Sequence, residues 1–269
     1  MTASRLGLRF AALGYLAMLL LVPVGFVFYR AFEHGLGYAW HAVTTPEAVH
    51  ALELTLLIAA IVVPVNTVVG IVLALALVRG NFRGRGVLNA VVDLPLALSP
   101  VIVGLALVLL YGRGGWLGGF ADHGLKVLFA LPGMVLATAF VSLPFVVREV
   151  VPVLREIGTE QEQAAETLGA GELQTFRRIT FPAIRWAVAY GVVLTTARAI
   201  GEFGAVSAVS GNVEGKTQTL PLYVKAQFDG FDTAGAYASS VVLAMLAIAV
   251  VVTLRALHPK EEAPMEEAT

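Results

Sequence analysis

Long stretches without a charged side chain constrain this chain most. Five of them run for 19 to 25 residues between charged neighbours: 10–29, 54–78, 94–112, 127–147 and 233–254. A sixth apolar stretch, 184–209, contains Arg198 and Glu202. A helix of about 20 apolar residues crosses a hydrocarbon core roughly 30 Å thick. The sequence therefore predicts an all-α, polytopic membrane protein with six transmembrane helices, in one domain covering residues 1–269.

The composition excludes several classes of protein. Hydrophobic residues make up 58% of the chain and charged residues 14%, against about 45–50% and about 25% in soluble domains. Cysteine is absent, so disulfide frameworks and thiolate metal sites are excluded. Lys and Arg number 18 and Asp and Glu 19, a balance that argues against nucleic-acid binding. The apolar stretches do not alternate as barrel strands do, which leaves a helical bundle in a lipid bilayer.

The distribution of Lys and Arg predicts the orientation in the membrane, because cytoplasmic loops carry an excess of positive charge. If the N-terminus is cytoplasmic, that side holds twelve basic residues: Arg5, Arg9, Arg79, Arg83, Arg85, Arg148, Arg155, Arg177, Arg178, Arg185, Arg255 and Lys260. The opposite side holds five: Arg30, Arg113, Lys126, Lys216 and Lys225. We therefore expect a multi-pass protein of a bacterial inner membrane, with both termini in the cytoplasm.

The longest hydrophilic segment, 148–185, carries the pattern of a short helix. Thr159 and Glu162 have the spacing of a capping box at a helix start, and Gly169 or Gly171 can end the helix in a left-handed conformation. Such a short helix is marginal in water and needs a surface on which to pack. Residue patterns alone leave two surfaces open, the membrane face of the protein itself or a groove on a partner.

Residues in this segment resemble a known signature. Gln163-Ala164-Ala165, then Gly169, Ile179 and Phe181-Pro182, resemble E-A-A-x3-G-x9-I-x-L-P of ABC importer permeases, with Gln for Glu and Phe for Leu. The resemblance implies a type I importer permease with a MetI-like fold, whose segment 148–185 docks on cytoplasmic ATPase subunits. It implies these coupling residues: Glu162, Gln163, Ala164, Ala165, Leu168, Gly169, Phe176, Ile179 and Pro182. ATP and magnesium would be bound by the ATPase, and this chain would hold no cofactor.

Other segments resemble the sulfate and molybdate permeases within that family, above all the sulfate/thiosulfate type. They are Asp93–Pro95, Leu98–Val101, Leu143–Glu149, Arg198–Gly211 and Lys216–Leu222. The resemblance implies import of sulfate or thiosulfate together with a second permease subunit and a periplasmic or extracellular sulfate-binding protein. Molybdate or tungstate, which share the tetrahedral shape of sulfate, remain an alternative cargo. A secondary anion transporter without a partner ATPase is the alternative mechanism.

Two charges lie inside the sixth apolar stretch, where a charged side chain costs about 2.5–3.5 kcal/mol on insertion scales. Arg198 and Glu202 are four residues apart, so they share a helical face. They can form a structural ion pair, or Arg198 can supply positive potential along an anion pathway that Glu202 moderates. We assign the translocation pathway to Arg198, Gly201, Glu202 and Ser99. For Asn66, we expect a hydrogen bond between helices rather than an ion contact.

Several further patterns do not support a catalytic or metal site. The glycines before Lys216-Thr217 are separated by three residues, whereas a phosphate-binding loop needs four. His34, His41 and His50 share one predicted outer loop without the acid–His spacing of a metal site. No G-x-S-x-G or H-E-x-x-H occurs. We therefore expect no catalytic residue and no metal ligand in this chain.

Overall fold

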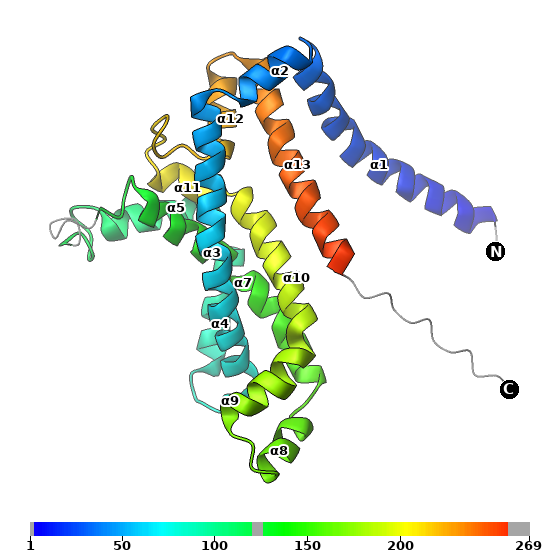
Figure 1. The fold of residues 1–269 in the computed structure, drawn as a ribbon, viewed down its shortest axis with the longest axis vertical. Coiled ribbons are helices and arrows are strands. Elements are labelled where there is room, and N and C mark those ends of the chain that lie inside the picture. The colour runs from blue at the N-terminus through cyan, green and yellow to red at the C-terminus, as the bar shows by residue number, and fades with distance from the viewer. Residues whose placement is uncertain (1–2, 120–125, 258–269) are drawn as a thin grey trace. The chain divides into compact units, whose positions relative to one another are not determined.

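The computed structural model describes residues 3–119 and 126–257, and within these ranges every regular element is a helix (Figure 1). The chain divides into two compact units, one formed by residues 3–57 and 210–246, the other by residues 58–209 and 247–257. Five helices are long and apolar enough to cross a membrane, and the bent pair α4–α5 makes a sixth if it is counted as one span. The prediction of an all-α, membrane-spanning protein is confirmed.

The first unit consists of helices tied by side-chain bonds at their ends. The hydroxyl of Thr55 accepts the backbone N–H of Leu220 at 2.8 Å, and Asp232 accepts that of Gly235 at 2.9 Å. These bonds satisfy amide groups that a helix start leaves without partners. The unit contains α1 (Ala3–Phe32), α2 (Leu36–Val43), the start of α3 (Pro46–Arg79), α12 (Leu220–Asp229) and the start of α13 (Thr233–Leu257).

The second unit is built around α7 and α10, which pack against each other (Figure 1). A β-carbon on Gly70 of α3 would lie 2.7 Å from the Cβ of Val146, and one on Gly191 would lie 2.7 Å from its Cα. Glycine on both sides of Val146 thus lets the backbones of α3, α7 and α10 approach closely. The two central helices are α7 (Leu131–Glu156) and α10 (Phe181–Ile200). Around them the unit holds α4 (Arg85–Ala97), α5 (Pro100–Tyr111), α8 (Glu160–Thr167), α9 (Glu172–Thr175) and α11 (Gly204–Val209).

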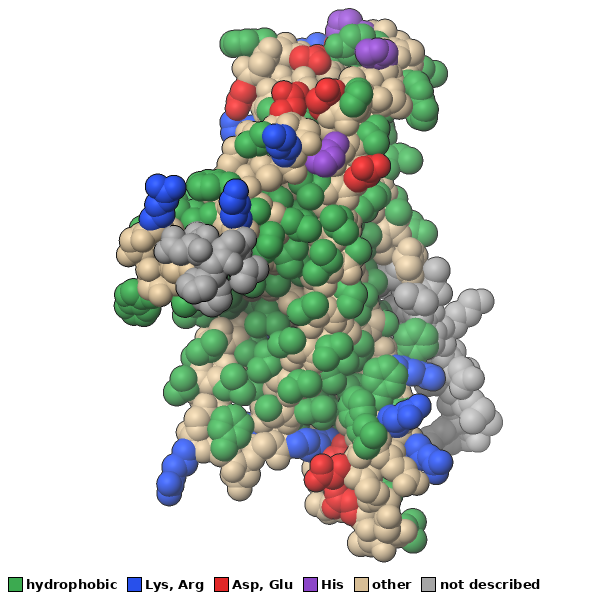
Figure 2. Space-filling view, turned by 60° about the vertical axis from the view of Figure 1, so that its left-hand side comes forward, with side chains coloured by type: hydrophobic (Ala, Val, Ile, Leu, Met, Phe, Trp, Pro, Cys, Tyr) green, Lys and Arg blue, Asp and Glu red, His purple; other side chains and the backbone are tan. Residues whose placement is uncertain are grey.

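A hydrogen bond between helices fixes the register of α3 against α7. The side-chain amide of Asn66 donates to the carbonyl of Ala139 and to the hydroxyl of Ser142, both at 2.9 Å. This confirms the expectation for Asn66. Outside the packed core, large hydrophobic side chains cover much of the surface visible in Figure 2. Such exposure suits a protein whose surrounding medium is lipid.

The stretch 94–112, predicted as one span, consists of two helices. Helix α4 ends at Ala97, α5 begins at Pro100, and the two helices are bent by 112°. The cause is local: a proline disfavours helical geometry in the residue before it, and Ser99 is extended with ψ at 134°. Pro100 then occupies the first turn of α5, where its missing N–H costs nothing.

The predicted boundaries of two other stretches also need correction. Helix α7 begins at Leu131 rather than near residue 127, and Phe129 before it has a positive φ of 56°. The stretch 184–209 is two helices, because α10 ends at Ile200 and α11 begins at Gly204. Glu202 lies in the turn between them and accepts the N–H of Ala205 at 2.7 Å, which stabilises the start of α11.

Candidate functional site

Helix α8 has a start and an end that the sequence largely specifies. Gly158, with φ at +64°, turns the chain out of α7, and Gly169, with φ at +85°, ends α8. The N–H of Ala170 bonds to the carbonyl of Ala165 at 3.0 Å, and that of Gly169 to Glu166 at 2.9 Å. This is a Schellman motif, in which glycine adopts the left-handed conformation at low cost. Of the two predicted stops, Gly169 is confirmed.

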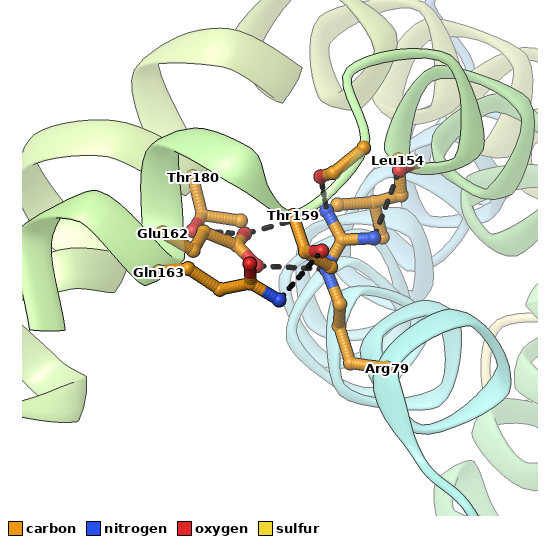
Figure 3. Close-up of polar contacts among 7 residues, drawn as sticks. Arg79, Leu154, Thr159, Glu162, Gln163 and Thr180 are labelled. Atoms are coloured by element: carbon orange, nitrogen blue, oxygen red, sulfur yellow. Dashed lines mark hydrogen bonds and ion pairs between the residues drawn. The ribbon is translucent and has the colours of Figure 1, made fainter.

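The predicted capping box at the start of α8 does not form. Thr159 makes no side-chain bond to the helix backbone, and its hydroxyl accepts the side-chain amide of Gln163 at 3.2 Å. Glu162 turns away from the helix start toward α3 (Figure 3). The carboxylate has a stronger partner there, because Arg79 offers a charged donor where the helix start offers a neutral amide.

Arg79, in the last turn of α3, lies at the centre of a network that includes Glu162 (Figure 3). Its Nε donates to Glu162 Oε2 at 2.8 Å. Its Nη1 donates to the carbonyl of Leu154 at 3.0 Å, and its Nη2 to that of Gly158 at 2.5 Å. The hydroxyl of Thr180 donates to Glu162 Oε1 at 2.7 Å. We call these five residues the Arg79 network.

The other coupling residues present an exposed surface. Leu168 is 89% exposed at the end of α8, and the signature positions Gln163, Ala164 and Gly169 are also exposed. Ala165 is half-buried. Leu173, in the short helix α9 that follows, is 72% exposed. Helix α8 itself has no buried residue, so its apolar side chains are left exposed.

A π-helix, η1 (Phe176–Thr180), connects α9 to α10. Phe176 packs on Phe181 with ring centroids 5.9 Å apart. Ile179 is half-buried, and Pro182 lies exposed in the first turn of α10. π-Helical turns occur often at functional sites. Beside them lies a surface hollow of about 750 Å³ lined by Gly171, Glu172, Leu173, Gln174, Arg177 and Arg178.

The intramembrane pair forms as predicted but at a helix break. Arg198 Nη1 lies 2.7 Å from Glu202 Oε2. The Glu202 side chain is 1% exposed, whereas that of Arg198 is 28% exposed. Oε1 of Glu202 accepts the N–H of Ala205, whereas the buried Oε2 has the guanidinium of Arg198 as its ion-pair partner and no hydrogen bond within the described ranges. The exposed part of this site is therefore cationic.

The two helix breaks beside the residues assigned to the pathway pack against each other. A β-carbon on Gly204 would lie 2.9 Å from the Cβ of Pro100, and one on Gly104 would lie 2.5 Å from the carbonyl oxygen of Ala205. The starts of α5 and α11 are thus in direct contact. Ser99 is exposed next to Pro100. Gly201 ends α10 and has no such close neighbour, so a role in packing is not required of it.

Two residues of the site escape prediction from the sequence. Arg79 is 83 residues from Glu162, and Thr180 is 18 residues away. The sequence signal for Arg79 is that it is one of the basic residues predicted to lie on the cytoplasmic side, where segment 148–185 is also predicted to lie. That signal gives a side of the membrane and no partner.

The long apolar helices define a polytopic membrane protein. Residues 66–260 match the family described as "Binding-protein-dependent transport system inner membrane component". The chain belongs to this family and is a permease subunit of the inner membrane.

Relatives and solved structures agree with this assignment. The chain is 49% identical over 250 residues to the sulfate transport system permease protein CysW of Synechocystis sp., covering 93% of this chain and 91% of that protein. It is 49% identical to CysW of Escherichia coli K12, with coverage of 86% and 80%. It is 40% identical to CysT of Salmonella typhimurium, with coverage of 86% and 84%. The fold resembles a bacterial ABC transporter involved in alginate import, at a TM-score of 0.78, 17% identity and 93% coverage of both chains.

Proposed function

We propose that this chain is a transmembrane permease subunit of an ATP-driven importer of sulfate and thiosulfate. The observation that carries the proposal is helix α8, which is closed by a Schellman motif and presents Leu168 and the signature residues to solvent. A secondary transporter has no use for such a surface. The choice of sulfate is supported by the 49% identity to CysW proteins over most of the chain.

The proposed partners follow from the same surface and family. Cytoplasmic ABC ATPase subunits would bind α8 and α9, and would hold the ATP and magnesium, so that this chain carries no catalytic site, cofactor or metal. A second, CysT-like permease subunit would complete the pathway. Helix α1 supports this pairing, because its apolar span 7–32 has no buried residue within the most apolar window and is free to contact another chain. A sulfate-binding protein would deliver the anion to outer segments including 211–232.

In the proposed mechanism the energy enters at α8 and the anion passes near Arg198. ATP binding would bring the ATPase subunits together and move the α8 helices, and the permeases would open outward. Hydrolysis would reverse the motion. Arg198 would attract the dianion while Glu202, already paired with it, weakens the attraction enough for release, since a pathway has to bind and also to let go. Both termini of the chain would lie in the cytoplasm.

Transport by a reconstituted complex tests the cargo. Proteoliposomes would contain this chain with its ATPase, second permease and binding protein, and labelled sulfate uptake would be measured with and without ATP. We expect ATP-dependent uptake that thiosulfate inhibits more strongly than molybdate or tungstate. Stronger inhibition by molybdate would assign the chain to molybdate, and uptake without the ATPase would indicate a secondary transporter.

A pair of glycine variants tests the docking surface. Gly169 and Gly171 are both exposed with open space at the Cβ position, but only Gly169 has a positive φ. Replacing Gly169 by Val forces a β-branched residue into the left-handed region, at a cost of about 1–2 kcal/mol, and α8 loses its end. We expect Gly169→Val to reduce copurification of the ATPase and Gly171→Val to retain more of it. Equal copurification would contradict docking through α8.

A further inference from the structure

The Arg79 network joins four segments that are far apart in the sequence. Arg79 ends α3, Leu154 and Gly158 lie at the end of α7, Glu162 lies on α8, and Thr180 precedes α10. All five belong to the same compact unit. The side chains of Arg79 and Glu162 are 20% and 16% exposed, so solvent screens this pair less than a surface pair.

The geometry of Arg79 is that of a connector between backbones rather than a simple ion pair. The last carbonyls of a helix have no partner within the helix, and at the end of α7 the guanidinium supplies donors to Leu154 and, in the following turn, to Gly158. The same planar group binds Glu162 through Nε. Its donors point in fixed directions, which a lysine ammonium cannot reproduce.

The direction of Glu162 separates it from its neighbour Gln163. Gln163 occupies the position of the signature glutamate, and among the described residues its exposed side-chain amide donates to Thr159. Glu162 Oε2 accepts from Arg79 Nε, and Oε1 accepts from the Thr180 hydroxyl at 2.7 Å and from Arg79 Nη2 at 3.4 Å. Its carboxylate is thus engaged by Arg79 and Thr180 within the permease. This position suggests that Glu162 acts through these contacts rather than by binding the ATPase directly.

We propose that Arg79 and Glu162 are positioning residues for energy coupling, which fix α8 to the ends of α3, α7 and α10 so that these elements move together. This inference rests on the proposed function, because it concerns how a displacement of α8 reaches the membrane helices. Without the network α8 would still meet the ATPase, but it would move independently of α3 and α10. ATP would then be hydrolysed with little transport.

The test compares Arg79→Gln and Glu162→Gln with the matched controls Arg83→Gln and Glu160→Gln, whose side chains are exposed and outside the network. Sulfate transported per ATP hydrolysed is measured in proteoliposomes, and amide hydrogen exchange of residues 160–168 is measured in the same purified complex. We expect each network variant to lower transport per ATP by about fivefold or more and to speed exchange in α8. The double variant should be no worse than either single one, as for residues in one network.

Two further variants distinguish a connector from an ion pair. The exchanged pair Arg79→Glu with Glu162→Arg keeps one positive and one negative charge, but places a carboxylate against the carbonyls of Leu154 and Gly158. We expect no rescue from this exchange. Arg79→Lys keeps the charge but has fewer donors in fixed directions, so hydrogen exchange in α8 should lie between that of the unmodified protein and that of Arg79→Gln. If Arg79→Gln does not fold, Arg79→Lys replaces it in the test.

The outcomes separate this inference from the proposed function. Unchanged exchange in α8 together with unchanged transport per ATP in both Gln variants would overturn the inference and leave the proposed function standing. Additive effects of the two single variants, or full rescue by the charge exchange, would also overturn it. If the unmodified complex shows no ATP-dependent uptake, the proposed function fails, and the exchange rates still report whether the network holds α8.

Discussion

The Arg79–Glu162 pair joins residues 83 positions apart, whereas the Arg198–Glu202 pair joins residues four apart. The nitrogen–oxygen distances are almost equal, at 2.8 Å and 2.7 Å. The first pair has hydrogen bonds to backbone carbonyls on one side and to a hydroxyl on the other. In the second pair a buried glutamate accepts an N–H while the arginine stays partly exposed.

The difference teaches that an ion pair's surroundings, rather than its length, determine what it can do. A long-range pair in which all three guanidinium nitrogens donate hydrogen bonds ties elements of the fold together. A local pair beside a helix break constrains little beyond one turn, and its exposed arginine is available to an anion. In the proposals made above, the first pair transmits motion and the second contacts the transported anion.

The largest effect is expected when the local pair is broken. Arg198→Ala leaves the carboxylate of Glu202 buried without its cation, which should lower the free energy of unfolding by about 3 kcal/mol and abolish sulfate uptake in a complex that still assembles and hydrolyses ATP. The double variant Arg198→Ala with Glu202→Gln removes the unpaired charge. Thermal unfolding in detergent should recover while uptake stays low, and recovery of uptake would show that Arg198 serves only the pair.

A somewhat smaller effect is expected from adding a methyl group where α5 packs against α11, next to the Arg198–Glu202 pair. A β-carbon on Gly104 would lie 2.5 Å from the carbonyl oxygen of Ala205, whereas one on Gly86 meets nothing within 4 Å. Gly104→Ala should therefore destabilise the protein by about 2 kcal/mol through overpacking. Gly86→Ala should leave the melting temperature the same or higher, and equal melting temperatures would show that α5 and α11 separate freely.

A third prediction weakens the long-range pair without removing a charge. Thr180→Val deletes the hydroxyl that donates to Glu162 Oε1 and should cost about 1 kcal/mol. Thr167→Val is the control, because that hydroxyl bonds only to the carbonyl of Ala164 in its own helix. Melting temperature and α8 hydrogen exchange should change more for Thr180→Val. Equal changes would mean that Thr180 is incidental to the network.

The smallest effect concerns a third side-chain pair, which is also long-range and lies in the other compact unit. Tyr38 donates to Asp232 Oδ1 at 3.0 Å, and this hydrogen bond raises the pKa of the Tyr38 phenol. A raised pKa contributes stability that is fully present below the unfolded tyrosine value of about 10 and is lost as pH rises through the folded value. Asp232→Asn should shift the tyrosinate absorbance titration to lower pH. Asp229→Asn, which alters a pair with Lys225, should leave it unchanged.

The sequence predicts what depends on composition and on neighbouring residues. Apolar length indicates the membrane helices, glycine at position 169 indicates the end of α8, and the four-residue spacing indicates the Arg198–Glu202 pair. These features require no knowledge of which segments meet. The break at Ser99-Pro100 also has a local cause. Hydropathy nevertheless predicts one span over 94–112, because an apolar stretch has the same hydropathy whether its helix is continuous or bent.

What depends on long-range contact escapes sequence reasoning. Thr159 and Glu162 have capping-box spacing, but a charged donor from another helix competes for the carboxylate and wins. The same competition explains why Glu162, a residue of the signature region, faces inward. No spacing rule connects it to Arg79, because the loop lengths between α3 and α8 are not specified by the pattern at either end.

Helix α10 connects the two ion pairs and places their residues on the same side of the helix. Thr180, immediately before it, and Arg198, in its last turn, are 18 residues apart, which is five full turns at 3.6 residues per turn and about 27 Å of rise. Gly191, where α7 approaches, lies 11 residues from Thr180 and so falls near the same line along the helix. If α10 turns as a rigid helix about its contact with Val146, a rotation at the Thr180 end therefore turns Arg198 through the same angle.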